Sequence, residues 1–246
     1  MNFDGFFWLA SLAALLVGLS KGGLPTIGML AVPVLSLVMS PVKAAVLLLP
    51  IYVVSDMVSV WLYRKHFSVP NLKILVPSSM VGVLIGWLTA SMISDSAVKL
   101  LIGLMGIGFC LNIWLRRTPQ ATQEVRPMKG VFWGVVTGFT SFICHAGAPP
   151  FQIYVLPQRL PKVVFAGTAT ILFTIVNLSK VLPYQQLNPY SEADLMQAAW
   201  LVPSALIGTI IGAYLTRKMA DKWFFRIVQF GLFAISVKLI ADAVWS

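Results

Sequence analysis

Long, uninterrupted runs of apolar residues dominate the chain, and short polar segments separate them. Runs near 20 residues match a membrane-spanning helix, whereas the strands of a membrane barrel alternate apolar and polar positions in segments of about ten. The pattern therefore predicts an all-α polytopic membrane protein. The ten predicted helices lie at about 3–20, 26–40, 42–63, 71–92, 97–115, 129–146, 148–158, 162–183, 194–216 and 222–244.

Composition narrows the class of protein further. Of 246 residues, 58% are apolar and 11% are charged, whereas a soluble domain carries roughly 25% charged residues. This excludes an ordinary soluble enzyme, a disordered chain and a nucleic-acid binder, despite the net charge of +10. The basic residues lie in short loops between apolar runs, which is the usual topology signal of a membrane protein.

The two halves of the chain resemble each other. The sequence VPS at 76–78, followed by Gly82 and Gly86, recurs 126 residues later, followed by Gly208 and Gly212. These small residues at a four-residue spacing are typical of closely packed membrane helices. We interpret the similarity as an internal duplication of about 120 residues; chance similarity between apolar segments is the alternative.

The duplication predicts the domain organisation. Gly18 matches Gly138 at nearly the same shift. We predict a first transmembrane repeat at 1–118, a cytoplasmic linker at 119–128 and a second repeat at 129–246. Each repeat would hold about five helices.

The placement of the basic residues predicts how the repeats are oriented. If each half crosses the membrane an odd number of times, most of the 18 Lys and Arg residues face one side, with Lys43 and Lys99 on the other. If the first two elements of each half form one broken crossing, the cations divide about evenly. The positive-inside rule favours the first arrangement, which makes the halves inverted repeats and places both termini outside the cytoplasm.

The first two elements of each half are expected to be short or broken. Residues 26–40 would form about 22 Å of helix against a hydrocarbon core of about 30 Å. Residues 148–158 form a still shorter run. A hairpin that meets in mid-bilayer and a tilted crossing both fit these lengths.

Glycine and proline interrupt the first half just before its short element. Lys21, Gly22, Gly23 and Thr26 lie in the segment GLSKGGLPTIG that starts at Gly18. Such a segment breaks a helix and leaves backbone N–H groups free, and free N–H groups beside a lysine can bind an anion. A tight cytoplasmic turn is the alternative.

A second interruption occupies the corresponding place in the second half. His145, Gly147 and Gln152 lie in the segment CHAGAPPFQ that starts at Cys144. Paired interruptions at corresponding places point to the binding site of a transporter. His145 could bind an anion or carry a proton, because its unperturbed pKa is near neutrality. A structural histidine is the alternative.

Charged side chains also lie inside predicted helices. Asp56 is in the third apolar run, and Lys180 follows Asn177 in the eighth. Because a charge in mid-bilayer costs about 2.5–3.5 kcal/mol on insertion scales, it normally faces a cavity or a partner. One interpretation is an Asp56–Lys180 ion pair across the pseudo-twofold axis. The other is a proton-coupling Asp56 with an anion-binding site that includes Asn177 and Lys180.

The remaining unusual residues have structural interpretations. Cys110 and Cys144 lie in apolar runs and form neither a disulfide framework nor a zinc site, so apolar packing is expected. Six aromatic residues near predicted helix ends are expected to anchor the chain at the membrane interface. They are Trp8, Trp61, Tyr63, Trp114, Trp223 and Trp245. The sequence contains no nucleotide-binding, metalloprotease or nucleophile-elbow motif, so we predict neither an enzyme nor a cofactor or metal.

The segment from Gly18 to Pro50, GLSKGGLPTIGMLAVPVLSLVMSPVKAAVLLLP, resembles the TauE/SafE sulfite-exporter family. The interrupted segment 138–152 is similar to the second repeat of that family. Here it reads HAGAPP from His145, where many members carry a glycine cluster. The resemblance implies a permease of a bacterial-type inner membrane for small sulfur-containing anions such as sulfite, sulfonates or sulfoacetate.

Together these features predict a secondary transporter of small anions that works by alternating access. Lys21, Gly22, Gly23, Thr26, His145, Gly147, Gln152, Asn177 and Lys180 would bind the anion, and Asp56 or His145 would carry the coupled proton. A passive anion channel, a membrane-embedded enzyme that uses Cys144, His145 and Asp56, and a non-transporting subunit are the alternatives. The sequence leaves a homo-oligomer open.

Overall fold

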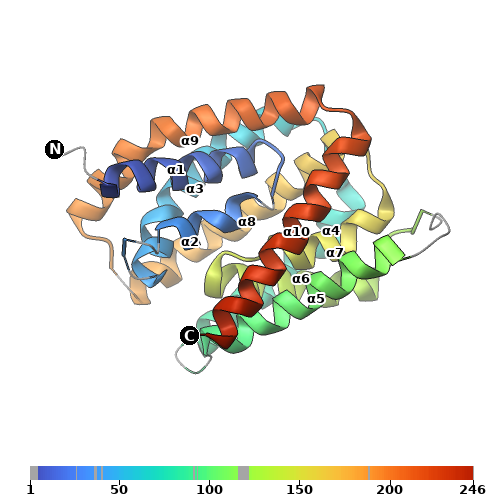
Figure 1. Ribbon diagram of the computed structural model, residues 1–246, viewed down its shortest axis with the longest axis horizontal. Coiled ribbons are helices and arrows are strands. Elements are labelled where there is room, and N and C mark those ends of the chain that lie inside the picture. Colours follow the sequence, from blue (N-terminus) through green and yellow to red (C-terminus); the bar gives the residue numbers. More distant parts are fainter. Residues whose placement is uncertain are drawn as a thin grey trace. The chain divides into compact units, whose positions relative to one another are not determined.

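The computed structural model describes residues 5–25, 27–35, 38–39, 41–90, 92, 94–115, 122–187 and 189–245. These residues form α-helices and short 3-10 helices, without a strand in the described ranges (Figure 1). The helices are α1 (Gly5–Lys21), η1 (Ile27–Leu30), α2 (Ala31–Leu35), α3 (Pro41–Tyr63), α4 (Val69–Thr89), α5 (Asp95–Leu115), α6 (Pro127–Cys144), α7 (Ala148–Val155), η2 (Leu156–Gln158), α8 (Lys162–Leu187), α9 (Glu192–Lys218) and α10 (Asp221–Val244).

The prediction of an all-helical fold is confirmed. The second element of the first half consists of η1 followed by the five residues of α2, and that of the second half consists of α7 followed by η2. Both are therefore short and irregular, as expected from their glycine and proline content.

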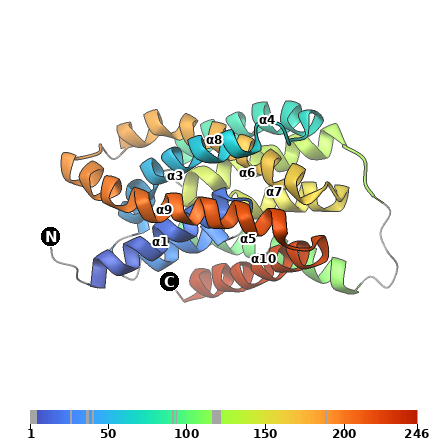
Figure 2. The ribbon, with the colours of Figure 1, turned by 90° about the horizontal axis from the view of Figure 1, so that it is seen from above.

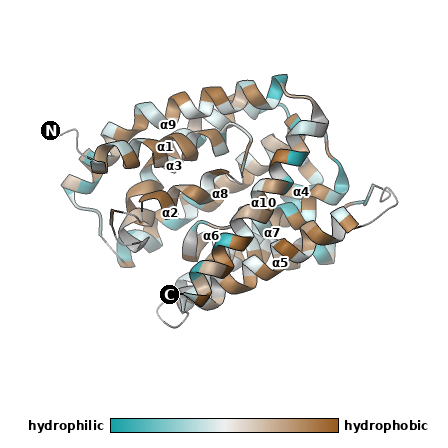
Figure 3. Ribbon diagram, in the orientation of Figure 1, coloured by the Kyte–Doolittle hydropathy of each residue, from teal (hydrophilic) through white to brown (hydrophobic). Residues whose placement is uncertain are grey.

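Among the described residues, five helical segments are long and apolar enough to cross a membrane. They are Ala44–Tyr63, Val69–Thr89, Lys162–Leu187, Glu192–Lys218 and Phe225–Val244, and Gly5–Lys21 is a shorter apolar helix. Figure 3 shows mainly apolar helices, with most hydrophilic residues near helix ends and in connecting segments. A helix satisfies its own backbone hydrogen bonds, which is the condition for crossing lipid.

The chain divides into two compact units. Unit 1 comprises Met1–Ser68 and Val163–Met219, and unit 2 comprises Val69–Lys162 and Ala220–Ser246. Each unit therefore combines helices from both halves of the sequence. The predicted repeats at 1–118 and 129–246 remain a prediction.

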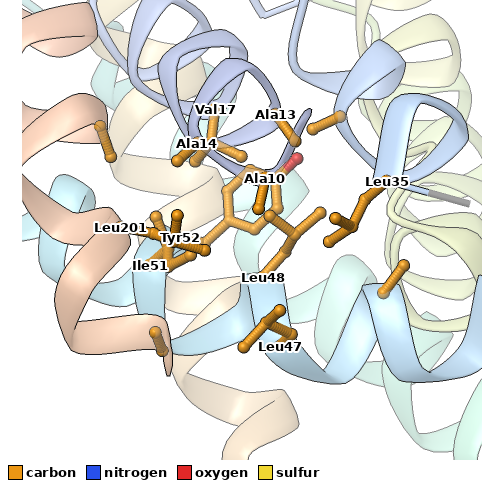
Figure 4. Close-up of a cluster of buried hydrophobic side chains, with 14 residues drawn as sticks. Ala10, Ala13, Ala14, Val17, Leu35, Leu47, Leu48, Ile51, Tyr52 and Leu201 are labelled. Atoms are coloured by element: carbon orange, nitrogen blue, oxygen red, sulfur yellow. The ribbon is translucent and has the colours of Figure 1, made fainter. Parts of the chain in front are cut away.

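Unit 1 has an apolar core between α1, α2, α3 and α9. Small side chains of α1, including Ala10 and Ala14, face Leu48 and Ile51 of α3 and Leu201 of α9. Figure 4 shows the ring of Tyr52 in the middle of this cluster. Burial of these apolar side chains holds α1 against the longer helices.

Glycines allow α1 and α9 to approach each other closely. A Cβ added to Gly18 would collide with the backbone carbonyl of Ala205, and one added to Gly208 would collide with that of Leu15. A Cβ on Gly212 would meet the backbone of Leu19. The expected close packing of small residues is confirmed for this pair of helices.

Unit 2 contains an equivalent pair, α4 and α6. A Cβ on Gly138 would collide with the carbonyl of Ser79, and one on Gly82 with the carbonyl of Val135. The same unit contains α5 and α10, which lie side by side and run in opposite directions (Figure 1, Figure 2). Cys110 is buried in this pair, as expected, and its thiol contacts the carbonyl of Gln229.

Candidate functional site

The predicted site residues lie in different units of the structure. Those in unit 1 are Lys21, Gly22, Gly23, Asp56, Asn177 and Lys180, and those in unit 2 are His145, Gly147 and Gln152. Thr26 lies outside the described residues. Unit 1 brings most of its members into direct contact, and we describe that cluster first.

An ion pair between α1 and α3 lies at the centre of the cluster. The Lys21 ammonium, at the last residue of α1, lies 2.7 Å from Oδ1 of Asp56 in α3. Lys21 is 4% exposed and Asp56 is 0% exposed. Removing one partner of such a buried pair leaves the charge of the other uncompensated. Each of these charges therefore needs the other in order to remain buried.

Asn177 connects this ion pair to a second lysine. Its amide nitrogen donates to Oδ2 of Asp56 at 2.8 Å, and its amide oxygen accepts from Nζ of Lys180 at 3.1 Å. Asn177 and Lys180 are both buried. The hypothesis of a direct Asp56–Lys180 pair is wrong in this respect, because the ammonium on Asp56 comes from Lys21 and Asn177 lies between Asp56 and Lys180.

Aromatic rings surround the ammonium of Lys21. Its Nζ lies 5.0 Å from the centre of the Tyr52 ring and 5.9 Å from that of Phe173. Both distances allow a cation–π attraction. The ring of Tyr52 is held in place because its hydroxyl donates to the carbonyl of Gly28 at 2.9 Å. The apolar core therefore positions the charged end of Lys21.

The glycine segment after α1 forms a tight turn in which the N–H groups of Gly22 and Gly23 are hydrogen-bonded. Gly23 has a φ of 117°, which favours glycine. The N–H of Gly22 donates to Gly18 at 2.8 Å and that of Gly23 to Ser20 at 3.2 Å. The expectation that these N–H groups are free is therefore wrong in this conformation, because the chain turns back onto the end of α1.

Hydroxyl groups from α3 and α9 bind the same turn. The carbonyl of Gly22 accepts from the hydroxyl of Tyr63 and, at 3.1 Å, from that of Thr216. Tyr63 is fully buried, so the prediction that it anchors the chain at the membrane interface is wrong. Trp8, Trp61, Trp223 and Trp245 are strongly exposed. Tyr63 differs from them because the broken end of α1 offers it an acceptor.

The predicted residues of unit 2 surround the break between α6 and α7. His145 is buried, has a φ of 54° and donates its backbone N–H to Ser141 at 3.2 Å. Gly147 precedes the first residue of α7, and Gln152 is buried within that helix. The side chain of Cys144 lies outside the described part of the structure.

Sequence reasoning missed several polar residues of unit 1. Tyr52 and Ser55 lie on the buried face of α3 near Asp56, and Thr170 of α8 contacts the carbonyl of Lys21 at 3.5 Å. The spacing of Tyr52, Ser55 and Ser59 by three and four residues is a signal in the sequence that they share one face of a helix. Among the described residues, no group of three His, Cys, Asp or Glu could hold a metal.

Apolar helices long enough to cross a bilayer, with ionisable side chains buried among them, define the class of multi-pass membrane proteins. Residues 10–239 match the family described as Sulfite exporter TauE/SafE. The match covers nearly the whole chain, so the chain belongs to this family of transporters. Searches of curated proteins and of solved structures found no significant match.

Proposed function

We propose that the chain is a proton-coupled secondary transporter of small oxyanions such as sulfite or sulfonates. The observation that carries this proposal is the buried cluster of Lys21, Asp56, Asn177 and Lys180 in unit 1. Two ammonium groups, one paired directly with the Asp56 carboxylate and the other linked to it through the Asn177 amide, suit an anion as the transported species. The family description points to the same class of substrate.

Competition for Lys21 would couple the anion to a proton. The Asp56 carboxylate occupies the Lys21 ammonium at 2.7 Å, so an incoming anion must compete with it. Protonation of Asp56 removes that competing charge and releases Lys21. The groups that face Asp56 are Lys21 from α1, Asn177 and through it Lys180 from α8, and Tyr52 from its own helix. By linkage, the proton and the anion then strengthen each other's binding.

Helix directions support the inverted repeat that alternating access requires. In unit 1, Asp56 bonds to Asn177, and further along α3 Tyr63 lies next to Gly167, which comes earlier in α8. The two helices therefore run in opposite directions, as α5 and α10 do in unit 2. A twofold axis that exchanges antiparallel helices is perpendicular to them and lies in the membrane plane. One half would then be inverted relative to the other.

Reciprocal glycine contacts support the same relation. Gly18 faces Ala205, and 120 residues later Gly138 faces Ser79, which lies 126 residues before Ala205. The contact of α1 with α9 thus has its counterpart in the contact of α6 with α4. We place the protein in the inner membrane of a bacterial-type cell, with both termini outside the cytoplasm.

We keep His145, Gly147 and Gln152 as proposed anion- or proton-binding residues of unit 2. Their burial and the left-handed turn at His145 support this role. A strained, buried turn is typical of functional sites.

Flux measurements on reconstituted protein test the proposal. Sulfite and methanesulfonate uptake into proteoliposomes should saturate and should increase when an inward proton gradient is imposed. We expect Lys21→Ala to lower the rate about tenfold or more, because it removes a charged partner of the anion. Lys73→Ala, which removes an exposed lysine of α4, is the matched control and should leave the rate unchanged.

Two further variants separate the roles of the predicted residues. Asp56→Asn should abolish the response to the proton gradient while leaving sulfite binding intact, and His145→Ala should lower the flux. Uptake that rises linearly with sulfite and ignores pH would instead indicate a passive channel. Wild-type rates in both Lys21→Ala and His145→Ala would refute the proposed site.

A further inference from the structure

Ser55 carries a buried hydroxyl without a hydrogen-bond partner in the described structure. The residue is 0% exposed, and its Oγ makes no hydrogen bond. Buried polar groups in proteins are nearly always hydrogen-bonded, because leaving one unpaired costs free energy. An unpaired hydroxyl beside a charged cluster is free to donate a hydrogen bond to a ligand.

Neighbouring helical hydroxyls show what an ordinary partner would be. Ser59, one turn further along α3, donates to the carbonyl of Ser55 at 2.8 Å, and Thr174 of α8 donates to that of Thr170 at 2.8 Å. A serine in a helix can normally satisfy itself in this way. In the described part of unit 2, Thr137 and Ser236 share the unpaired state of Ser55. The hydroxyl of Tyr190 in unit 1 is also unpaired. Ser55 differs from these three residues because it is next to Asp56 of the lysine–aspartate cluster.

The position of Ser55 on α3 places it beside that cluster. Asp56 is the next residue, and Tyr52, whose ring lies under the Lys21 ammonium, is three residues earlier and adjacent on the helix surface. Tyr52, Ser55, Asp56 and Ser59 are all buried, whereas Val54 and Met57 are exposed. Ser55 therefore belongs to the inward face of α3 that carries the charged groups.

We propose that the Ser55 hydroxyl is a substrate-binding group that donates a hydrogen bond to an oxygen of the transported anion. This inference rests on the proposed function. Lys21 supplies charge, which any anion satisfies, whereas a hydroxyl supplies a directed donor. Ser55 thereby favours oxyanions such as sulfite and sulfonates over a spherical anion such as chloride.

Ligand binding to the purified full-length protein in detergent tests this role. Calorimetric titrations with sulfite, methanesulfonate and chloride would compare wild type, Ser55→Ala, Ser55→Cys and Ser59→Ala. We expect Ser55→Ala to weaken sulfite and methanesulfonate binding about tenfold, as is typical of a hydrogen bond to a charged group. Chloride binding should change less. Ser55→Cys is nearly isosteric but a weak donor, so it should also weaken sulfite binding.

The thermal stability of the ligand-free variants gives the second measurement. Ser55→Ala should keep the wild-type Tm or raise it, because it removes an unpaired group and introduces a better helix former. Ser59→Ala, on the same face, should bind sulfite like wild type.

Unchanged sulfite affinity in both Ser55 variants would overturn the inference. A lowered Tm with unchanged affinity would also overturn it, because it would assign the hydroxyl to a buried water. If wild type itself binds no anion, the proposed function fails instead of this inference.

Discussion

Each carboxylate oxygen of Asp56 contacts a polar group from another helix. Its Oδ1 pairs with Lys21 of α1, and its Oδ2 accepts from Asn177 of α8. A buried ion pair can cost as much desolvation energy as it returns in attraction, so it is weak evidence for stability alone. Its position inside apolar helices instead favours a role in binding or proton transfer.

Substitution of Lys21 should show that the charges of Lys21 and Asp56 contribute to stability together and not independently. Lys21→Ala should lower the free energy of unfolding by about 3–5 kcal/mol, because it leaves the Asp56 charge buried without its ammonium. The double variant Lys21→Ala/Asp56→Ala should lose less than the sum of the single variants. Unfolding titrations in detergent would measure this, and additive losses would contradict the coupling.

The charges of the site could be predicted from the sequence, but their pairing could not. Asp56 and Lys180 stand out because each interrupts an apolar run. Lys21 looks like an ordinary lysine at a helix end, and nothing local indicates that the broken end of α1 carries it to α3. The spacing of Ser55 from Tyr52 and Ser59 places it on one face of the helix, but nothing local indicates that its hydroxyl lacks a partner, since a helical serine usually bonds to its own backbone.

At the scale of elements, the structure packs pairs of helices together through glycines, at positions that the predicted repeat would relate. Gly18 allows α1 to pack closely against α9, and Gly138 allows α6 to pack closely against α4. In each case a side chain would meet backbone, which cannot move aside as a flexible side chain can. These contacts allow small residues to bring two backbones together in the absence of a strong hydrophobic drive within lipid.

Alanine at either glycine should therefore be costly. We expect Gly18→Ala and Gly138→Ala each to lower the free energy of unfolding by about 1–3 kcal/mol through overpacking. Gly108→Ala in α5 is the control, because a Cβ there meets nothing within 4 Å. It should be neutral or stabilising by up to about 1 kcal/mol, since alanine is the better helix former. Thermal unfolding of the three variants would show whether Gly18→Ala and Gly138→Ala lose similar stability while Gly108→Ala loses none.

At the scale of the whole molecule, each compact unit draws helices from both halves of the chain. Residues distant in sequence therefore lie close together within one unit. The guanidinium of Arg217, near the end of α9, donates to the carbonyl of Leu62 near the end of α3 at 3.1 Å. Arg64 is also exposed at this end, which the basic-residue distribution predicts to be cytoplasmic.

Cysteine labelling from each side of the membrane tests this arrangement. In a background without Cys110 and Cys144, Arg64→Cys and Arg217→Cys should both react with an impermeant thiol reagent from the cytoplasmic side. Ser191→Cys should react from the opposite side, because the 27 residues of α9 separate it from the cytoplasmic end and span about 40 Å. Labelling of Arg64→Cys and Arg217→Cys from opposite sides would contradict the inverted repeat.

The sequence by itself determined the membrane class, the position of the helices and the short, broken elements. Apolar runs, prolines and glycines act locally, so their consequences can be read from neighbouring residues. It also indicated which glycines pack closely, because their spacing recurs in both halves. Only the tertiary structure decided that Lys21 pairs with Asp56, that Tyr63 is buried against Gly22 and that Ser55 lacks a partner. These outcomes depend on which helices of the two halves meet, and such contacts between distant segments leave no local pattern in the chain.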